Sequence, residues 1–432
     1  MWGLIDCDNF FCSCERVFRP DLERTPVVVL SNNDGCVVAR SKEVKKMNIP
    51  EGLPYHEMLQ QYPDSGIVAF SSNYSLYGDM SARVMAVLRT EAPAVLQYSI
   101  DEAFLDLSGM SCDNIKEWGE ALCRKVRKWT GIPVSLGIAP TKTLAKVASR
   151  FAKEYPGYKK CCVIATEDQR IKALSLFPVN KVWGIGRRIT KSLEYYGITN
   201  AHEFAWRPRS WIQTKYHITG VRTWMELNGE NAIELDDLNS TTKKSIMTSR
   251  SFPGMIDNIE SLTPHIANYA ARCSLKLRRQ NSACSLITVF VQSNHFRDDL
   301  EQYDNSMSHS FPTATNSVIE IVTEALNLLK KVFRKGIRYK RAGVMVSGIC
   351  SAEAIQPDLF YYNAEQSQKF RNVSEAIDEI NRRLGMDMIT LASQHYGNTG
   401  ADGKPVKFVD AIKRALKSPD YSTRVNDFKI KS

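Results

Sequence analysis

The run YSIDEAFLDLS, residues 98–108, places two adjacent acids, Asp101 and Glu102, inside an otherwise apolar segment. Its tyrosine, isoleucine, leucine and phenylalanine residues predict a pair of buried strands. Two like charges removed from water repel each other, and each is costly to desolvate. A fold that buries this run must bring a positive group to the acids, and a divalent metal ion is the leading candidate.

A second acidic motif lies at the N-terminus, where the apolar strand WGLID (2–6) ends on Asp6 and Asp8 follows. In an extended strand Asp101 and Glu102 would point to opposite faces, so both reach one ion only at a turn or a strand end. Carboxylates and main-chain carbonyls suit Mg²⁺, and two such ions form the general clamp for phosphoryl transfer. The alternative is that these acids cap strands or helices; for Asp8 the two interpretations weigh equally.

The basic charge of the chain is clustered. The net charge is +10 over 432 residues, a length that predicts roughly two to four domains. The run 330–341 holds seven Lys or Arg and no acid, 272–279 holds four, and residues 403–432 carry eight basic and three acidic residues, hence +5. These clusters favour an extended anion-binding surface and a nucleic-acid partner, with solvated faces or a mildly basic enzyme as the alternatives.

The eleven cysteines form no regular framework and include no CxxC motif, so a zinc site is not predicted. Many lie in apolar runs, where they are interpreted as small core residues. This usage indicates a reducing, cytoplasmic location. The N-terminus carries acids where a signal peptide needs an apolar stretch, and no apolar run is long enough to predict a membrane span.

The pattern of strands and amphipathic helices predicts an α/β or α+β domain that ends near residue 165. The helix expected at 114–133 has an aromatic stripe with Trp118 and Trp129, which we expect in the core. Beyond this domain the sequence predicts, in order, short helices at 167–235, a polar linker at 236–245, a small basic α+β domain at 246–347 and a polar, irregular segment at 351–432.

Four motifs, DCDNFF, SSNYSLYGDMSARVM, YSIDEAFLDLSG and SLGIAPTKTLAKVASRFAK, together resemble the Y-family of translesion DNA polymerases. SNNDGCVVARSKEVK and the tail LKSPDYSTRVNDF are most similar to its UmuC subfamily. The resemblance covers nearly the whole chain and implies an α+β, multidomain right hand. Its parts would be the palm (1–17 and 74–165), fingers (18–73), helical thumb (166–236), linker (237–245), α+β little finger (246–348) and a C-terminal segment (349–432).

The resemblance also implies the catalytic site. Asp6, Asp101 and Glu102, with the main-chain carbonyl of Cys7, would hold two Mg²⁺ ions, for which Mn²⁺ could substitute. The primer 3′-hydroxyl would attack the α-phosphate of an incoming dNTP, and pyrophosphate would leave. Positioning and charge neutralisation would carry this chemistry.

Four residues are implied contacts of the nucleotide. Phe11 stands where the family places its steric gate against a ribose 2′-hydroxyl, and its neighbour Phe10 belongs to the same stretch, although core packing is the favoured interpretation for Phe10. Lys153 matches the family lysine that holds the triphosphate. Lys45 falls where many relatives have arginine, and lysine keeps the charge without the bidentate fork. For Lys45 a solvated face is an equal alternative.

The predicted DNA contacts lie in the second half of the chain. Gly184 and Gly186, in VWGIGRR, look like a helix-hairpin-helix turn whose main-chain N–H groups receive a phosphate; an ordinary tight turn is the alternative. Arg278 and Arg279 belong to a basic cluster of the expected little finger, where phosphate contacts would give affinity without sequence choice.

A short motif after the expected little finger predicts a protein partner. QPDLF (356–360) resembles the clamp-binding peptide of bacterial polymerases. Gln356, Leu359 and Phe360 would make the contacts, with the two apolar side chains in a pocket of the sliding clamp. Chance occurrence of a five-residue motif is the alternative.

The resulting hypothesis is an error-prone, template-directed DNA polymerase for translesion synthesis in DNA repair and the SOS response. Its implied partners are primer-template DNA, the sliding clamp, a UmuD-like dimer and a RecA filament, and its implied location is the cytoplasm, with nucleoid association when active. One alternative is a catalytically silent DNA- or clamp-binding accessory factor, against which the intact acid trio argues. Another is a different two-metal enzyme, such as a nucleotidyl cyclase, which would need neither the thumb turn nor the clamp peptide.

Overall fold

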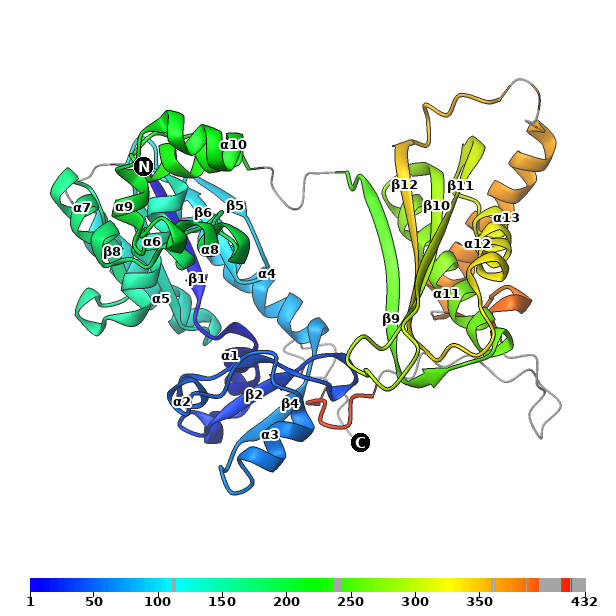
Figure 1. The fold of residues 1–432 in the computed structure, drawn as a ribbon, viewed down its shortest axis with the longest axis horizontal. Coiled ribbons are helices and arrows are strands. Elements are labelled where there is room, and N and C mark those ends of the chain that lie inside the picture. The colour runs from blue at the N-terminus through cyan, green and yellow to red at the C-terminus, as the bar shows by residue number, and fades with distance from the viewer. Residues whose placement is uncertain are drawn as a thin grey trace, which may run out of the picture. The chain divides into compact units, whose positions relative to one another are not determined.

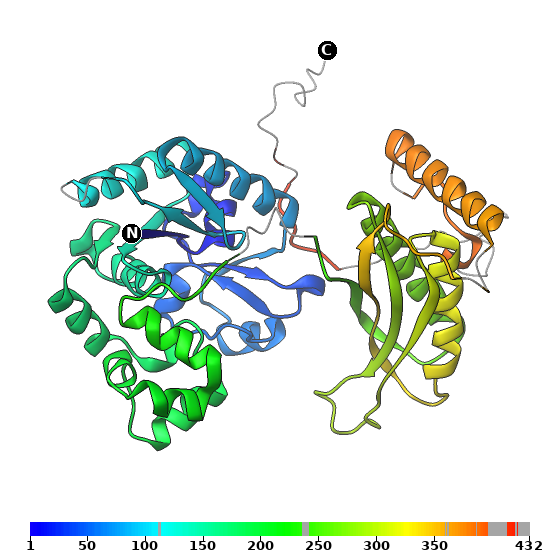
Figure 2. The same ribbon diagram turned by 90° about the horizontal axis from the view of Figure 1, so that it is seen from above.

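The computed structural model describes residues 1–110, 114–235, 242–358, 360, 363–385, 387–395, 413–419 and 421. They form two compact units, each with its own sheets and core (Figures 1 and 2). Unit 1 consists of Met1–Thr241 and Arg414–Ser432, and unit 2 of Thr242–Lys413. The expected linker at 236–245 spans the boundary between the units, and most of it lies outside the described residues.

The central element of unit 1 is a five-stranded sheet of order β5-β6-β1-β7-β8. Its strands are β1 (Trp2–Cys7), β5 (Ala94–Gln97), β6 (Glu102–Asp106), β7 (Val134–Ala139) and β8 (Cys161–Val163). All neighbours are antiparallel except β7 and β8. Residues 3 to 5 of β1 are buried in succession, so both faces of this sheet are covered at this strand.

Ile5 of β1 faces a core shared with three helices, α1 (Phe10–Val17), α4 (Tyr74–Glu91) and α5 (Ile115–Thr130). Leu4, one residue earlier, faces a second core shared with α6 (Lys142–Glu154). The strand β1 therefore presents alternate side chains to two different layers. Residues 4 and 6 share the α6 face, and this places Asp6 beneath α6.

A smaller sheet of order β3-β2-β4 lies in the same unit. It contains β2 (Val27–Leu30), β3 (Val37–Arg40) and β4 (Val68–Ser71), with β4 parallel and β3 antiparallel to β2. Val28, Leu30 and Met58 are part of its own apolar core. The short helices α2 (Lys42–Lys46) and α3 (Tyr55–Gln61) complete this region.

Helices follow the five-stranded sheet in sequence, as expected for residues 167–235. They are α7 (Glu167–Leu176), α8 (Arg187–Tyr195), α9 (Ala201–Ala205) and α10 (Arg209–Leu227). Their apolar faces join the core beneath α6, in which Phe177, Leu193 and Phe204 are buried with Phe151 of α6. The helical region and α6 therefore share one apolar core.

Unit 2 is a four-stranded antiparallel sheet of order β11-β10-β12-β9 with helices packed against it. Its elements are β9 (Ser245–Ile256), α11 (Ile259–Arg279), β10 (Ser282–Ser293), β11 (Asp304–Thr315), α12 (Val318–Val332), β12 (Tyr339–Ser351) and α13 (Ala364–Leu384). The helices α11 and α12 share one apolar core with the sheet. This order of strand, helix, two strands, helix and strand is that of an α+β domain, as expected for residues 246–347.

Two sequence interpretations are wrong. The segment 351–432 was expected to be irregular, but α13 (Ala364–Leu384) is a 21-residue helix of unit 2 (Figure 1, orange). The helix has polar residues on most positions and buries only one narrow edge, which includes Ile377. Trp129 was expected in the core, yet 61% of it is exposed; it lies on the last turn of α5, with Lys125 Nζ 4.4 Å from the centre of its ring.

The cysteine interpretation is confirmed for most of the described cysteines. Eight of them are buried as free thiols: Cys7, Cys12, Cys14, Cys123, Cys161, Cys162, Cys273 and Cys284. Among the described residues, no helix has the length and apolar character needed to cross a membrane.

Candidate active site

Asp6 and Glu102 lie directly opposite each other on the neighbouring antiparallel strands β1 and β6. Leu4 and Phe104, two residues along each strand, belong to the core that α6 covers, so both acids also face α6. Like charges directly opposite on paired strands are destabilising. This face of the sheet therefore requires cations.

Helix α6 supplies cations from two positions. Lys153 Nζ lies 2.5 Å from Asp6 Oδ1, and Lys146 Nζ lies 2.8 Å from Glu102 Oε2. The two lysines are seven residues apart, about two helical turns, so they project from the same side of α6. Lys146 was not among the predicted site residues, although this spacing from Lys153 could have identified it.

Asp101 occupies a bend that ends where β6 begins, as the adjacent acids require. Its main-chain oxygen accepts a hydrogen bond from Cys7 N at 2.9 Å, and its Oδ1 accepts one from Ser99 Oγ at 2.6 Å. The backbone thus joins Asp101 to the end of β1. The structure brings Asp6 and Glu102 together, but within the described part of the chain no three His, Cys, Asp or Glu side chains converge as a metal-binding group.

The electrostatics of the site centre on Asp6. Burial raises the pKa of this carboxyl; Lys153 opposes the rise, and repulsion by Glu102 and Asp8 adds to it. Burial alone would lower the pKa of Lys153, but attraction by Asp6 and Asp8 outweighs burial and raises it. The site therefore holds a protonated lysine, Lys153, beside the carboxyl of Asp6, whose ionised form an added cation would stabilise.

A pocket of about 400 Å³ lies over these ion pairs. It is lined by both acids and by five cationic side chains, Lys45, Lys146, Arg150, Lys153 and Lys181, together with apolar groups that include Phe177 and Trp183. Burial and repulsion by Lys153 lower the pKa of Lys45, whose Nζ donates to Asn9 Oδ1 at 2.6 Å. The predicted nucleotide lysines Lys45 and Lys153 thus line one pocket with Asp6.

The chemistry of the site fits a hard divalent cation. Asp6 and Glu102 offer carboxylate oxygens on one face of the sheet, and carboxylate oxygens are ligands that Mg²⁺ prefers. Burial raises the pKa of Asp6, and a nearby cation would stabilise its ionised form. Lys153 and Lys146 supply that charge in this structure.

Asp8 belongs to a separate network at the edge of the site. It is 6% exposed, and its carboxylate contacts Lys160 at 2.7 Å and Ser135 Oγ at 3.0 Å. Lys153 is farther away, at 3.6 Å. These contacts satisfy the buried carboxylate, and they support a structural role for Asp8.

Phe10 and Phe11 have different surroundings. Phe10 is buried in the core, which agrees with the packing interpretation and leaves its ring little surface for a nucleotide. Phe11 is partly exposed and stacks on Tyr77, with ring centroids 4.4 Å apart and planes at 16°. The ring of Tyr74 meets Phe11 edge-on. Two aromatic rings of α4 therefore fix the orientation of Phe11.

The GIG segment forms a tight turn into α8. Gly184 has φ +89°, and a Cβ at this position would collide with the Thr223 hydroxyl, so glycine is required there. Gly186 is the N-cap residue of α8. This local geometry fits both the predicted phosphate-binding turn and an ordinary turn.

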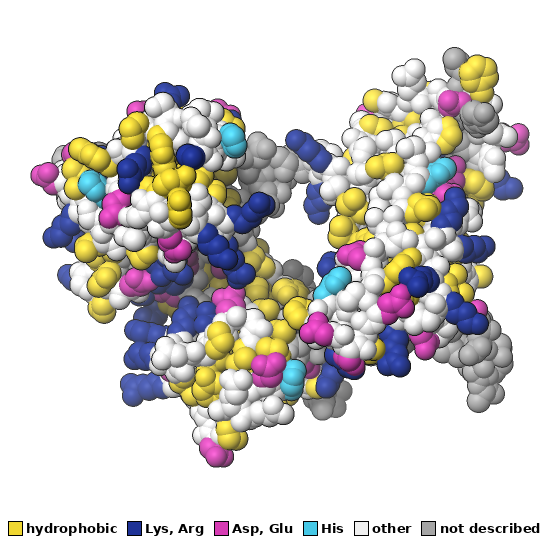
Figure 3. Space-filling model, viewed as in Figure 1, with side chains coloured by type: hydrophobic (Ala, Val, Ile, Leu, Met, Phe, Trp, Pro, Cys, Tyr) yellow, Lys and Arg dark blue, Asp and Glu magenta, His cyan; other side chains and the backbone are white. Residues whose placement is uncertain are grey.

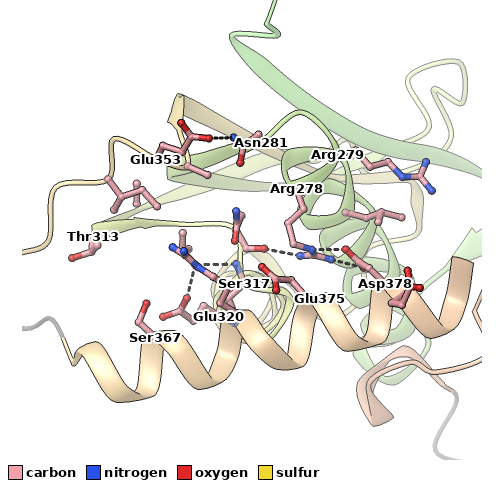
Figure 4. A pocket seen from close by; sticks show the side chains of 18 of the residues that line it. Arg278, Arg279, Asn281, Thr313, Ser317, Glu320, Glu353, Ser367, Glu375 and Asp378 are labelled. Carbon is pink, nitrogen blue, oxygen red and sulfur yellow. Dashed lines mark hydrogen bonds and ion pairs between the residues drawn. The ribbon is translucent and has the colours of Figure 1, made fainter.

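Arg278 does not form part of an open basic surface. Its guanidinium makes two hydrogen bonds to Asp378 of α13, at 2.6 and 2.8 Å, and a third to the main-chain oxygen of Asn316 (Figure 4). Its side chain is 10% exposed. Arg278 is therefore a structural residue that holds α13, and its predicted contact with DNA is not supported. Arg279, the next residue, is exposed and stays a predicted contact.

The predicted clamp peptide begins on an exposed segment that follows β12. Gln356 is exposed and Phe360 is 87% exposed, whereas Leu359 lies outside the described residues. Asp358 N donates to Thr313 Oγ1 of β11 at 2.9 Å, which anchors the segment beside the sheet. An exposed large aromatic side chain is available for a partner.

Comparison with known proteins identifies the class to which this fold belongs. Residues 5–150 match the impB/mucB/samB family, 243–359 its C-terminal domain, and 371–429 a domain of unknown function, DUF4113. A solved Y-family DNA polymerase chimera, Dbh-Dpo4(243-245)-Dbh, is 20% identical with a TM-score of 0.67 and covers 81% of this chain and 99% of its own. The fold is that of the Y-family DNA polymerases.

Full-length relatives define the branch of that class. Protein UmuC of Salmonella typhimurium is 38% identical over 99% of each chain. Protein ImpB of the same organism is 39% identical over 100% of this chain and 99% of its own. DNA polymerase IV 1 of Mesorhizobium japonicum is 25% identical over 88% of this chain. The chain belongs to the impB/mucB/samB family, the UmuC-like Y-family DNA polymerases, so the predicted family and fold class are confirmed.

Proposed function

We propose that this protein is an error-prone, template-directed DNA polymerase that extends primers past damaged template bases. The observation that carries the proposal is the pairing of Asp6 and Glu102 in register beneath the lysines of α6, at one wall of a pocket of about 400 Å³. Family membership sets the reaction class, and the site contains the charged groups that this reaction needs.

In the proposed reaction the primer 3′-hydroxyl attacks the α-phosphate of a dNTP. A new P–O bond forms, the bond from the α-phosphate to pyrophosphate breaks, and the hydroxyl proton leaves to solvent. Asp6, Asp101 and Glu102 would hold two Mg²⁺ ions, which lower the pKa of the hydroxyl and neutralise phosphate charge. Lys153 and Lys45 would attract the triphosphate to the pocket, and Phe11 would exclude a ribose 2′-hydroxyl.

The proposed partners follow from surfaces outside this pocket. Exposed Lys and Arg side chains on both units (Figure 3, dark blue), including Arg279, would contact the phosphates of primer-template DNA. The 356–360 segment would bind the sliding clamp. A UmuD-like dimer and a RecA filament complete the proposed SOS assembly, at the nucleoid in the cytoplasm.

Primer extension on an undamaged and on an abasic template tests the proposal. We expect the wild type to extend both primers with Mg²⁺, and we expect Asp101→Asn to lose extension by at least about 100-fold while DNA binding is retained. If the wild type is inactive alone, the assay is repeated with the clamp, UmuD-like and RecA-like partners. Inactivity in the complete mixture, or full extension by Asp101→Asn, would refute the proposed site.

A further inference from the structure

The end of the chain returns to unit 1. The described residues 413–419 and 421, here called the C-terminal strap, follow unit 2 in sequence but contact unit 1, in which all of them except residue 413 are grouped (Figure 1, red). They fall within the region that matches a domain of unknown function. The proposed function assigns the strap no role.

The first half of the strap extends the backbone pairing at the end of β4. Ser71 N donates to the main-chain oxygen of Leu416 at 3.0 Å, and Leu416 N donates to Ser71 Oγ at 3.0 Å. Ala415 N donates to Asp34 Oδ2 at 2.9 Å, while the other oxygen of Asp34 accepts from Ser71 Oγ. Because Asp34 and Ser71 are buried polar residues, these bonds satisfy groups that would otherwise lack partners.

The second half of the strap has one buried serine side chain. Ser418 is 5% exposed, and its Oγ accepts a hydrogen bond from Asn73 Nδ2 at 3.0 Å. The side chain of Ser418 also lies beside the buried carboxylate of Glu15, whose Oε2 has no hydrogen-bond partner among the described residues. Beyond Ser418, Tyr421 stacks on Phe18 with centroids 4.4 Å apart and planes at 5°. Contacts to α1, to the N-cap of α4 and to β4 thus come from one peptide segment.

A series of contacts connects the residues around Ser418 to Phe11. Glu15 Oε1 accepts a hydrogen bond from Tyr77 OH at 2.8 Å, and the ring of Tyr77 stacks on Phe11. Asn73 is the N-cap of α4, where its side chain accepts from Leu76 N. The residues that Ser418 contacts therefore fix both the hydroxyl of Tyr77 and the first turn of the helix that carries this ring.

We propose that the C-terminal strap positions the steric gate: Ser418 orders Glu15 and Asn73, these order Tyr77, and Tyr77 holds the ring of Phe11. Ser418 is thus a positioning residue for sugar selection that lies 407 positions from Phe11 in the chain. The inference rests on the proposed function, since a steric gate has meaning only for a nucleotide-selecting polymerase.

The physical basis is the cost of unpaired buried polar groups. Loss of the Ser418 hydroxyl leaves the Asn73 amide without its acceptor. It also removes a polar group beside Glu15, whose Oε1 accepts from Tyr77 OH and whose Oε2 has no hydrogen-bond partner within the described residues. A buried carboxylate that lacks donors moves toward another donor or toward water. Either movement releases Tyr77, and with it the stacked ring of Phe11.

The test measures sugar discrimination, the ratio of kcat/KM for a dNTP to that for the matching rNTP, in full-length variants under conditions where the wild type extends primers. We expect Ser418→Ala to lower the ratio about threefold to tenfold, the effect of one lost hydrogen bond. Ser418→Thr, which keeps the hydroxyl, should restore most of it. Ser210→Ala, at an exposed serine of α10, is the matched control and should leave the ratio unchanged.

The outcomes separate the two proposals. A lowered ratio in Ser418→Ala, with dNTP incorporation near the wild-type rate, supports the positioning role and shows that the variant is folded. An unchanged ratio in Ser418→Ala would overturn it while leaving the polymerase assignment intact, and a second variant, Tyr77→Phe, should also lower the ratio if Tyr77 holds the ring of Phe11. If the wild type and Phe11→Ala both incorporate no nucleotide even with partner proteins present, the proposed function fails and this inference fails with it.

Discussion

At the scale of the residue, successive side chains of a strand point to opposite faces of the sheet, and this determines which acids lie close together. Asp6 and Glu102 share the α6 face because each lies two residues from a core residue of that face. The sequence identified both acids as site residues. It could not supply their partners, because the reach of Lys146 to Glu102 depends on how α6 packs on the sheet. For the same reason the burial of Arg278 against α13 was not foreseen.

Replacement of Phe11 by alanine tests the steric gate. Phe11→Ala removes a ring that is held by Tyr77 and leaves open space where a ribose 2′-hydroxyl would lie. We expect rNTP incorporation to rise by about 100-fold relative to dNTP incorporation, a change of ~2.7 kcal/mol in discrimination. Single-nucleotide incorporation with each sugar measures the ratio. The control is Phe296→Ala, at an exposed ring of unit 2; equal sugar ratios in Phe11→Ala and the wild type would contradict the assignment.

Glu15 gives a prediction for pH. Burial raises the pKa of this carboxyl above its ordinary value of 4.5, although the Tyr77 and Ser418 hydroxyls oppose the rise. Above the raised pKa the folded protein therefore holds a charge that burial disfavours, and this lowers the free energy of unfolding. As the pH falls through the raised pKa toward 4.5, the folded state binds the proton first and the cost disappears.

The matched variant for this prediction is Glu15→Gln, which stays neutral at every pH. We expect the free energy of unfolding of the wild type, relative to that of Glu15→Gln, to rise as the pH is lowered from 8 toward about 5. Denaturant unfolding of both proteins at several pH values measures this difference. A difference that is constant with pH, or that falls at lower pH, would contradict the direction of the pKa shift.

At the scale of the element, close packing of α6 on β7 sets the position of the lysines. A Cβ at Gly137 would collide with the main-chain atoms of Ser149 and Ala145, so only glycine lets the helix lie this close. The sequence predicted an α/β or α+β domain in this region from its pattern of strands and amphipathic helices. It did not predict α13, whose apolar residues Phe370, Val373 and Ile377 have helical spacing but stand among polar residues.

Gly137→Ala tests this packing. The added methyl group meets backbone, which cannot rotate away, so we expect a loss of about 3 kcal/mol or more in the free energy of unfolding. Primer extension should also fall, because α6 and its Lys146 and Lys153 are displaced from the acids. Thermal and denaturant unfolding measure the loss. Gly157→Ala, where a Cβ meets no atom within 4 Å, is the control and should be near neutral; equal stability of the two variants would contradict the argument.

At the scale of the whole molecule, the chain forms two units and then returns to the first. The boundary near residue 241 agrees with the polar composition of 236–245. The return of the C-terminal strap could not be predicted, because Ser71 and Leu416 are 345 residues apart and neither position has a pattern that indicates the other. The finer division of unit 1 into palm, fingers and thumb stays a prediction.

The clamp peptide is best tested without truncation, since any deletion before Gln356 would also remove the C-terminal strap. We expect the double variant Gln356→Ala, Phe360→Ala to keep basal primer extension and to lose its stimulation by the sliding clamp, because the exposed ring is the anchor. Product lengths with and without clamp give the readout. Gln368→Ala, on α13, is the control; undiminished stimulation of the double variant would remove the motif from the interface.

The most direct test of the central claim is templated single-nucleotide incorporation by the wild type, Glu102→Gln and Asp106→Asn. Glu102 and Asp106 lie on one face of β6, but only Glu102 lines the pocket with Asp6. The account predicts that the wild type and Asp106→Asn prefer the nucleotide complementary to each of the four template bases and that Glu102→Gln incorporates none. Incorporation that ignores the template base, or that survives Glu102→Gln at the wild-type rate, would contradict it.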